Sequence, residues 1–453
     1  SKSVRVNIHG LKFDFGSTDE EAVADGYTGV AAATSYSDIN GYGIKSGSPT
    51  VGGTASATNA TSDYLQGNFE FDFKATKGDF YSVEVTYRGT LTTGYVNSDL
   101  AGYTLGTSDA MTTSTFTIPA TREIIDLRID GAIAQISITK QAKRQKRAKR
   151  VVHHIGDSTS ANNGSWAYRL RSLMQSYPEL AELCDFHNDG AGGRNLSTYY
   201  TQGKLASVLN DIYPGDVVMF GNNGTNGMGN SFEADMNYYL DAAETLGAQV
   251  IINSYSPHGA VANYASGYNS KTNTFDSYRK DSYETVVRRV ADQRAANDAD
   301  YLGFVEIGKN ADAAFNAYVQ DYAKNGYASA DAAAQAIISC FTDHNHYSNG
   351  TLACDLMLNG YGDVKGIVAQ MVEILSEEPE PEPDPEPEPD PDPTPDPEPE
   401  PGTVGIQNVG MNSSATTQEV VYSLSGQLLD EGTVAAQKPG TIYVKNGRKV
   451  MVK

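Results

Sequence analysis

The stretch VVHHIGDSTSANNGSWAYRL, residues 151–170, decides the fold of the central part of the chain. Its first five residues, 151–155, form a short β-rich run that indicates a buried strand. The run GDST at 156–159 ends that strand, and a helical pattern begins near Gly164. A strand that passes through a tight turn into a helix is typical of a parallel α/β sheet, where reactive groups gather at the carboxyl ends of the strands. Ser158 therefore lies where either a nucleophile or a simple helix cap is expected.

The same alternation of strand and helix continues along the chain as far as residue 375. The last helical stretch is interrupted near Gly360. The pattern predicts a parallel sheet covered by helices on both faces, a three-layer, flavodoxin-like α/β domain over residues 151–375. We expect strands at 151–155, 183–187, 216–220, 249–253 and 302–307, and helices at 232–246, 277–296, 311–323 and 351–375.

The region before this domain, residues 1–139, has a different sequence pattern, without the alternating helical stretches. Short β-rich runs recur, and Gly, Ser, Thr and Asn fill the gaps between them. This spacing favours an N-terminal β-sandwich. We expect strands at 4–8, 69–73, 81–87, 115–118, 124–129 and 133–139.

Two segments between the folded parts carry concentrated charge. Residues 140–150, KQAKRQKRAKR, hold seven bases and no acid, and predict an exposed basic hinge, with a polyanion-binding patch as the alternative. Residues 376–402 hold twelve acids and no base, and proline occupies every second position from 379 to 401. Because proline removes backbone donors and the like charges repel, this segment predicts a stiff, extended linker.

The tail, residues 403–453, predicts a small β module. The pair Asn446-Gly447 is a strong turn signal, and it lies between two β-rich runs at 442–445 and 449–452. The sequence therefore predicts a β-hairpin near the C-terminal end of the chain.

Composition excludes several classes of protein. The chain holds 34 Lys and Arg against 56 Asp and Glu, a net charge of −22, which argues against a nucleic-acid partner. No apolar run approaches the roughly 18 residues of a membrane span. The three cysteines, Cys184, Cys340 and Cys354, are too few for a disulfide framework. Two alternatives exist for Cys340 and Cys354: they form a disulfide bridge, or they are buried free thiols. Cys184 stays unpaired in either case.

A second reactive stretch lies far along the chain. The sequence DHNHYSNG at 343–350 places Asp343 three residues before His346. A serine nucleophile needs an imidazole base, and the imidazole needs a carboxylate that fixes its tautomer. The order Ser158, Asp343, His346 therefore predicts a catalytic triad, in which His344 is the alternative base. The acid and the two histidines are too closely spaced for a tetrahedral metal site, so no metal is expected.

The motifs together resemble the SGNH, or GDSL-like, hydrolase superfamily. The Ser-Thr variant of GDST and the Gly-Ser-Trp that follows resemble its rhamnogalacturonan acetylesterase branch. DGAGGRNLSTYY at 189–200 and MFGNNGTN at 219–226 resemble the two intermediate blocks of the family. The resemblance implies an oxyanion hole formed by the Ser158 N–H, the Gly193 N–H and the Asn223 amide. One departure is Gly224, where the family usually has aspartate.

Two further resemblances concern the modules that flank the predicted hydrolase domain. LKFDFG at 11–16, DGYTGV at 25–30 and NGYGI at 40–44 resemble the galactose-binding-like sandwich that precedes the catalytic domain in some bacterial rhamnogalacturonan acetylesterases. The tail at 403–453 resembles the C-terminal sorting modules of exported Bacteroidetes proteins. These resemblances imply a packing or carbohydrate-contact module at one end and export or surface display at the other.

Several other polar residues border the predicted cleft. Asp157, Arg194, Tyr255 and His258 follow strand ends and are candidate substrate-binding residues. His153 and His154 lie on the strand before the nucleophile, so at most one of them faces the cleft. A buried, hydrogen-bonded role is the expectation for this pair.

The residues and the resemblance predict a secreted serine carbohydrate esterase that removes O-acetyl groups from plant cell-wall polysaccharide. The resemblance implies rhamnogalacturonan as the substrate, with acetylxylan or a feruloyl ester as the alternative. A non-catalytic polysaccharide-binding surface protein is the alternative class, and Gly224 is its best support. No cofactor is expected. The expected partner is acetylated plant polysaccharide, with no nucleic acid and no membrane span, and the tail would engage a bacterial surface or secretion machinery. The expected location is secreted or cell-surface, with the periplasm as an alternative.

Overall fold

A computed structural model gives the fold of most of the chain. Residues up to 380 form one compact unit, and residues 381–453 form another. The structure describes residues 10–17, 19, 22–94, 102–194, 196–221, 232–257, 267–278, 282–342, 346, 351–376, 421–422, 428–429, 442–445 and 448–451. The expected strand at 4–8 therefore lies outside the described residues. None of the helices in the described part is both long and apolar enough to cross a membrane.

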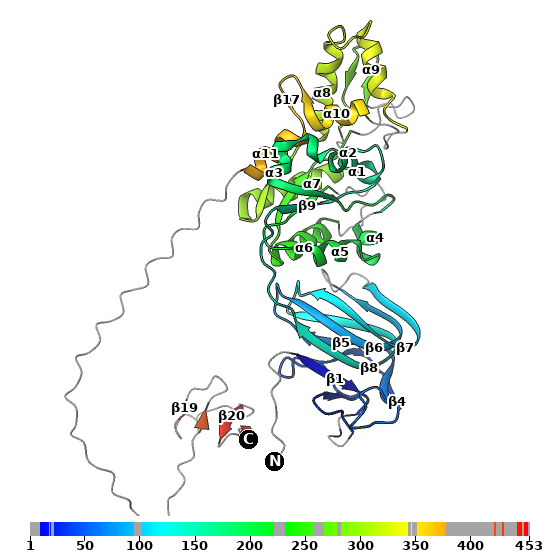
Figure 1. Cartoon of the computed structure of the whole chain (residues 1–453), viewed down its shortest axis with the longest axis vertical. Coiled ribbons are helices and arrows are strands. Elements are labelled where there is room, and N and C mark those ends of the chain that lie inside the picture. The colour runs from blue at the N-terminus through cyan, green and yellow to red at the C-terminus, as the bar shows by residue number, and fades with distance from the viewer. Residues whose placement is uncertain are drawn as a thin grey trace, which may run out of the picture. The chain divides into compact units, whose positions relative to one another are not determined.

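The N-terminal region is all-β, as predicted, and its strands lie at the blue end of Figure 1. Hydrogen bonds join all eight described strands into one sheet, so the expected division into the two sheets of a sandwich is not seen among them. The strands are β1 (Leu11–Phe15), β2 (Thr28–Val30), β3 (Tyr42–Gly47), β4 (Thr50–Gly53), β5 (Asp63–Lys74), β6 (Phe80–Thr93), β7 (Tyr103–Pro119) and β8 (Ile124–Lys140).

Strand β8 organises this sheet. It pairs with β5 and β1 along one edge and with β6 along the other. The runs expected at 124–129 and 133–139 are both inside it. Gly131 separates these runs and lies beside Gly67 of β5 and Gly89 of β6. A Cβ atom on Gly131 would lie 2.1 Å from the Arg88 carbonyl oxygen, so this close crossing of three strands requires glycine.

The central region contains the predicted parallel sheet. Its strand order is β10-β9-β11-β12-β15, and every neighbouring pair is parallel. This is the doubly wound order 2-1-3-4-5, in which ligands bind beyond the carboxyl ends of the strands. The strands are β9 (Arg150–Ile155), β10 (Cys184–Asn188), β11 (Val217–Phe220), β12 (Gln249–Asn253) and β15 (Tyr301–Val305).

Helices cover both faces of this sheet, as predicted. On one face lie α4 (Leu196–Thr201), α5 (Lys204–Asp211), α6 (Phe232–Thr245) and α7 (Ser282–Asn297). On the other lie α2 (Trp166–Ser172), α3 (Pro178–Leu183), α8 (Gly308–Gln320), α9 (Ala330–Ile338), α10 (Thr351–Asn359) and α11 (Ile367–Ser376). The expected interruption near Gly360 is a small hairpin of β16 (Gly360–Tyr361) and β17 (Val364–Lys365). Short elements complete the region: α1 (Ser158–Ala161), a 3-10 turn (Met174–Ser176), β13 (Tyr268–Asn269) and β14 (Thr274–Phe275).

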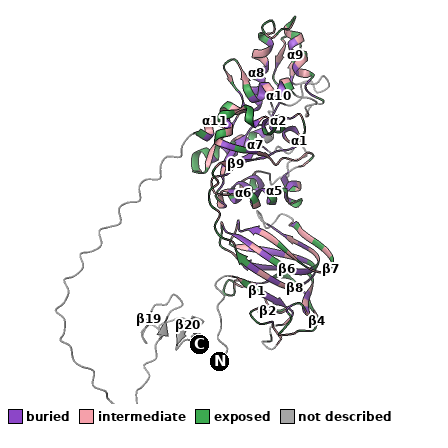
Figure 2. Ribbon diagram, in the orientation of Figure 1, coloured by how far each residue is buried: buried purple, intermediate pink, exposed green. Residues whose placement is uncertain are grey.

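Alternating side chains of the central strands build two separate cores. On β11, Val218 and Phe220 join the core on the α5 side, while Val217 and Met219 join the core on the α2 side. All four are fully buried, and Figure 2 shows the same burial at β9. Each such side chain stabilises the fold by about 1.5–3 kcal/mol relative to exposure. The chemistry of the sheet is therefore confined to its rim and to polar positions on its faces.

Much of the basic segment 140–150 is exposed, but Arg144 and Arg147 pack against neighbouring elements, and its role as a hinge stays a prediction. The Arg144 guanidinium lies 3.6 Å from the centre of the Phe80 ring and 4.8 Å from that of Tyr213. It also donates a 2.7 Å hydrogen bond to the Ile212 carbonyl. Arg147 pairs with Asp216 at 3.0 Å. These contacts connect the segment to both the N-terminal sheet and the central domain. The boundaries of these two parts at residues 139 and 151 stay predictions.

The described part of the C-terminal unit is a four-stranded antiparallel sheet. Its strands are β18 (Val421–Tyr422), β19 (Leu428–Leu429), β20 (Ile442–Lys445) and β21 (Arg448–Met451). The pairing of Lys445 with Arg448 confirms the predicted hairpin, with the second strand starting one residue earlier than expected.

Candidate active site

The turn after β9 holds Ser158 in a fixed position. Gly156 packs so closely that a Cβ atom there would lie 2.5 Å from Cε1 of His154, so no other residue fits. Asp157 caps α1, and its Oδ1 atom accepts hydrogen bonds from the Thr159 N–H at 2.9 Å and the Thr159 hydroxyl at 2.8 Å. Ser158 is therefore the first helical residue, at the carboxyl edge of the sheet.

His346 contacts Ser158 directly. Its Nε2 atom lies 2.8 Å from the Ser158 Oγ atom, although 188 positions separate the two residues in the chain. The His346 carbonyl accepts a 2.8 Å hydrogen bond from the Thr342 N–H. When Nε2 is unprotonated, the serine hydroxyl donates to it, which is the geometry that general-base activation of a nucleophile requires. The structure thus brings together the predicted nucleophile and the predicted base.

The third predicted member of the triad, Asp343, lies outside the described residues, and so does the alternative base His344. Asn223, the predicted side-chain donor of the oxyanion hole, and His258 also lie outside them. Their roles stay predictions.

A glycine-rich loop approaches Ser158 from β10. A Cβ atom on Gly192 would lie 3.4 Å from the Ser158 Cβ atom, so the Gly192 backbone lies directly against the nucleophile. Gly193 has a left-handed φ of +68° and open space around its Cα atom. Within the described residues, the N–H groups of Ser158, Gly192 and Gly193 make no hydrogen bond. Backbone donors left unused beside a nucleophile can stabilise an oxyanion.

Tyr199, on α4, fixes this loop to the nucleophile turn. Its hydroxyl accepts a hydrogen bond from the Ala191 N–H at 2.7 Å and contacts the carbonyl oxygens of Gly156 and Ala191. The side chain is fully buried, and burial raises the pKa of its hydroxyl. The sequence reading missed Tyr199; the only available signal was its position a few residues after the glycine-rich stretch.

Two of the predicted substrate-binding residues, Asp157 and Tyr255, are buried and do not border an open cleft. Asp157 is fully buried and acts as the helix cap, so its carboxylate does not face a substrate. Tyr255 is 2% exposed and lies beneath the surface after β12, so it does not line an open groove. Arg194 is half-buried beside the nucleophile loop, where Nη1 donates to the Gly192 carbonyl at 3.3 Å and Nε to Gln202 at 2.6 Å.

The two histidines on β9 point to opposite faces of the sheet, and both are buried as expected. His154 packs edge-on against Trp166, with ring centres 4.8 Å apart, and stacks on Phe186. Burial lowers the pKa of His154 to about 4, so this imidazole is neutral near pH 7. His153 faces α5, and its Nδ1 atom lies 3.0 Å from a carboxylate oxygen of Asp189.

The three cysteines are buried and form no disulfide, so the bridge considered between Cys340 and Cys354 is not formed. The thiol of Cys354 donates to the Gly164 carbonyl at 3.1 Å, and that of Cys340 to the Ala336 carbonyl at 3.5 Å. Burial raises the pKa of Cys184 to about 12 and that of Cys354 well above its usual value. Cys184 and Cys354 are therefore protonated packing groups at neutral pH.

Comparison with known proteins finds likeness only among solved structures. No protein-family model matches the chain, and no curated protein matches it. A Bacillus subtilis protein solved in a structural-genomics project is 17% identical, with a TM-score of 0.34, and the match covers 81% of this chain and 96% of that one.

Two further neighbours have described chemistry. A member of the lipolytic G-D-S-L family from Veillonella parvula is 14% identical, with a TM-score of 0.27, over 45% of this chain and 93% of that one. A family two carbohydrate esterase from Clostridium thermocellum, solved with cellohexaose, is 12% identical, with a TM-score of 0.23, over 55% and 85%. SGNH hydrolases and carbohydrate esterases are thus among the structures that the chain resembles at low identity. Since none of these TM-scores reaches 0.5, the chemistry of the site rests on its own geometry.

Proposed function

We propose that the chain is a serine esterase of the SGNH type that acts on O-acetylated polysaccharide. The observation that carries this proposal is the 2.8 Å contact between His346 Nε2 and Ser158 Oγ, formed by residues that only the fold brings together. A nucleophile and base at hydrogen-bond distance, beside unused backbone donors, match the requirements of acyl transfer.

The proposed reaction has two steps. His346 takes the Ser158 proton while Oγ attacks the acetyl carbonyl, and the carbonyl oxygen becomes an oxyanion held by backbone N–H groups of Ser158 and the 192–193 loop. The sugar hydroxyl leaves with the proton from His346, and an acetyl-enzyme remains. Water, deprotonated by His346, then attacks the acetyl-enzyme and releases acetate with restoration of the Ser158 hydroxyl. Water is the co-reactant of the second step.

For the substrate, we favour rhamnogalacturonan, with acetylxylan or a feruloyl ester as the alternative. The sequence blocks around Ser158 support this choice. Arg194 adds a physical reason, because its guanidinium lies against the Gly192 carbonyl next to the nucleophile. A fixed cation there attracts an acidic polysaccharide, although the chain as a whole is acidic. For the location, we propose secretion or display on a bacterial surface, supported by the sorting-like C-terminal tail.

The first test replaces Ser158 and His346 separately with alanine and measures hydrolysis of p-nitrophenyl acetate. Loss of either residue should lower kcat/KM by about 10³-fold or more, because each removes one half of the nucleophile–base pair. Circular dichroism of both variants should match the parent. A folded Ser158→Ala protein that hydrolyses the ester at the parent rate would remove the proposal.

The second test measures acetate release from acetylated pectins and acetylated xylans. Preference for an acidic pectin that is weakened in Arg194→Gln, with p-nitrophenyl acetate hydrolysis unchanged, would support rhamnogalacturonan. Equal release from neutral xylan would favour the alternative. Retention on polysaccharide without any acetate release would instead support the non-catalytic binding protein.

A further inference from the structure

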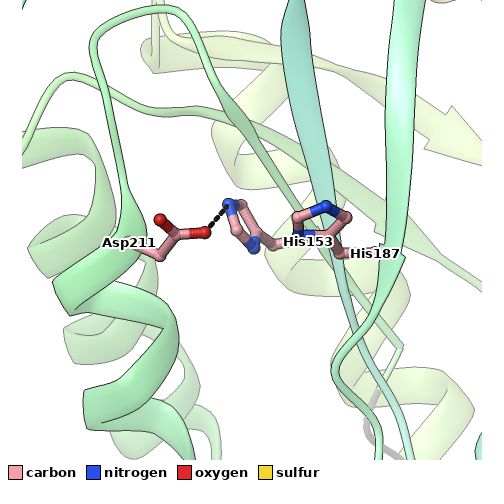
Figure 3. A group of neighbouring side chains, drawn as sticks. All are labelled: His153, His187 and Asp211. Atoms are coloured by element: carbon pink, nitrogen blue, oxygen red, sulfur yellow. Dashed lines mark ion pairs between the residues drawn. The ribbon is translucent and has the colours of Figure 1, made fainter.

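Two histidines and an aspartate meet on the α5 side of the central sheet (Figure 3). His153 on β9 and His187 on β10 are directly paired in the parallel ladder, so their side chains project from the same face. Their rings are perpendicular, with centres 5.3 Å apart. Asp211, the last residue of α5, approaches them from the covering helix. One ligand atom from each of the three residues lies within 4.8 Å of those of the other two.

His153 has one satisfied nitrogen and one unsatisfied nitrogen. Its Nδ1 atom lies 3.0 Å from Asp189 Oδ2, so a proton on Nδ1 is donated to that carboxylate. Among the residues that the structure describes, the buried Nε2 atom has no hydrogen-bond partner, and the whole side chain is only 1% exposed. In Figure 3 the ring points this nitrogen toward Asp211. A buried lone pair without a donor costs free energy unless a cation meets it.

The two carboxylates beside Nε2 cannot supply that missing donor. Asp211 Oδ2 lies 4.0 Å away and Asp216 Oδ2 lies 3.9 Å away; both are acceptors, and both are beyond hydrogen-bond distance. Arg147 binds the outer oxygen of Asp211 at 3.0 Å and also binds Asp216. Asp216 is further occupied by the N–H groups of Val151 and Tyr213. Asp211 Oδ2 alone is therefore left to face the imidazoles.

We propose that His153, His187 and Asp211 bind a divalent transition-metal ion, for which Zn²⁺ is the fitting example. Two neutral imidazoles and a carboxylate are ligands that zinc prefers, with water completing four-coordination. Asp189 would act as the outer carboxylate that fixes the tautomer of a metal-binding histidine. With bonds of about 2.0–2.1 Å, tetrahedral ligand atoms lie about 3.3 Å apart. The His153 Nε2 and Asp211 Oδ2 atoms, which are 4.0 Å apart, would therefore close by about 0.7 Å, and no pair of the three ligand atoms would close by more than about 1.5 Å.

The position of the site indicates a structural role. Its ligands join two adjacent strands of the sheet to α5, and α5 lies next to the basic segment through the Arg147–Asp211 pair. Asp189 begins the loop whose Gly192 lies against Ser158. A bound ion would thus brace the sheet, the covering helix and the start of the nucleophile loop, without contacting the reacting atoms.

The test uses the full chain, stripped with a chelator and then titrated with Zn²⁺ in competition with a chromogenic chelator. We expect saturable binding that His346→Ala retains, together with a rise in Tm on zinc addition. His187→Ala and Asp211→Asn should weaken zinc binding at least 100-fold and abolish the Tm rise, while their Tm values in chelator stay close to that of the parent. Asp189→Asn should weaken binding about 10–100-fold.

A matched control is Asp185→Asn, on the same strand, β10, as His187. The exposed Asp185 carboxylate pairs with Lys149, so this replacement should leave the zinc affinity unchanged. The proposal is overturned if the parent binds no zinc, if binding disappears in His346→Ala, or if Asp211→Asn binds zinc as tightly as the parent. Because Asp211 is half-exposed at a helix end, its replacement by asparagine tests the ligand without disturbing a core.

Discussion

Replacing Gly192 with alanine tests the arrangement of the nucleophile loop most directly. The added methyl group would lie 3.4 Å from the Ser158 Cβ atom and 3.2 Å from Asn162 Oδ1. The second contact is tight, so the loop or the Asn162 side chain must shift by a few tenths of an ångström. Such a shift would move the backbone N–H groups of the loop relative to Ser158, and oxyanion donors must lie about 3 Å from the oxygen that they stabilise.

The size of the effect follows from this geometry. A misplacement of about 1 Å costs about 10²-fold in rate, and a shift of a few tenths of an ångström costs correspondingly less. We therefore expect kcat/KM for p-nitrophenyl acetate to fall about 10-fold in Gly192→Ala, which is about 1.4 kcal/mol of transition-state stabilisation. Stability should change little, because Gly192 does not have a left-handed backbone.

Gly193→Ala tests backbone strain at the neighbouring position. Its methyl group would enter open space, but its φ of +68° is strained for alanine, at a cost of about 1–2 kcal/mol. This variant should therefore lose stability in urea denaturation, whereas Gly192→Ala should lose activity. If Gly192→Ala keeps parent activity, the placement of the loop against Ser158 is wrong.

Three further predictions concern other contacts. Tyr199→Phe removes the hydroxyl that binds Ala191, so kcat should fall more than KM changes and stability should drop by about 1–3 kcal/mol; parent kinetics would show that this hydroxyl does not position the loop. Arg144→Met removes the guanidinium that contacts Phe80 and Tyr213, so limited proteolysis within 140–150 should become faster. An unchanged cleavage rate would show that these contacts do not hold the segment in place. Burial raises the pKa of Asp14 to about 6, so the folded state holds this proton more tightly than the unfolded chain, and stability should fall by about 1–3 kcal/mol as pH rises from about 4 to about 6. Asp14→Asn should flatten this part of the urea-denaturation pH profile, and an unaltered slope would exclude Asp14 as its source.

The sequence predicted the central sheet well because its strands are short β-rich runs that alternate with helical stretches. The observed β12 is the expected run at 249–253, β11 begins one residue later than expected, and β10 is shifted by one residue at both ends. The contact between Ser158 and His346 was also predictable, since nucleophile and base are recognisable residue types in recognisable motifs. Local pattern and local chemistry were sufficient for these features.

Features that depend on packing between distant segments were not predictable. The sequence suggested two strands separated near Gly131. In the structure Gly131 lies within the single strand β8, where its backbone passes close to Gly89 of β6. The role of Tyr199 depends on its hydroxyl meeting carbonyl groups from two separate loops. The packing of Arg144 within the basic segment was not predictable, because the two aromatic rings that it contacts come from residues far away in the chain.

The stacking of Arg144 has a consequence for how this protein can be recombined. One guanidinium lies against Phe80 of the N-terminal sheet and Tyr213 of the central domain, so this contact joins the two parts, as does the contact between Tyr103 and Tyr200. A chimera that joins this central domain to a foreign N-terminal module would lose Phe80 and leave Arg144 facing an unmatched surface. A transplant of the central domain should therefore carry Phe80, Arg144 and Tyr213 together.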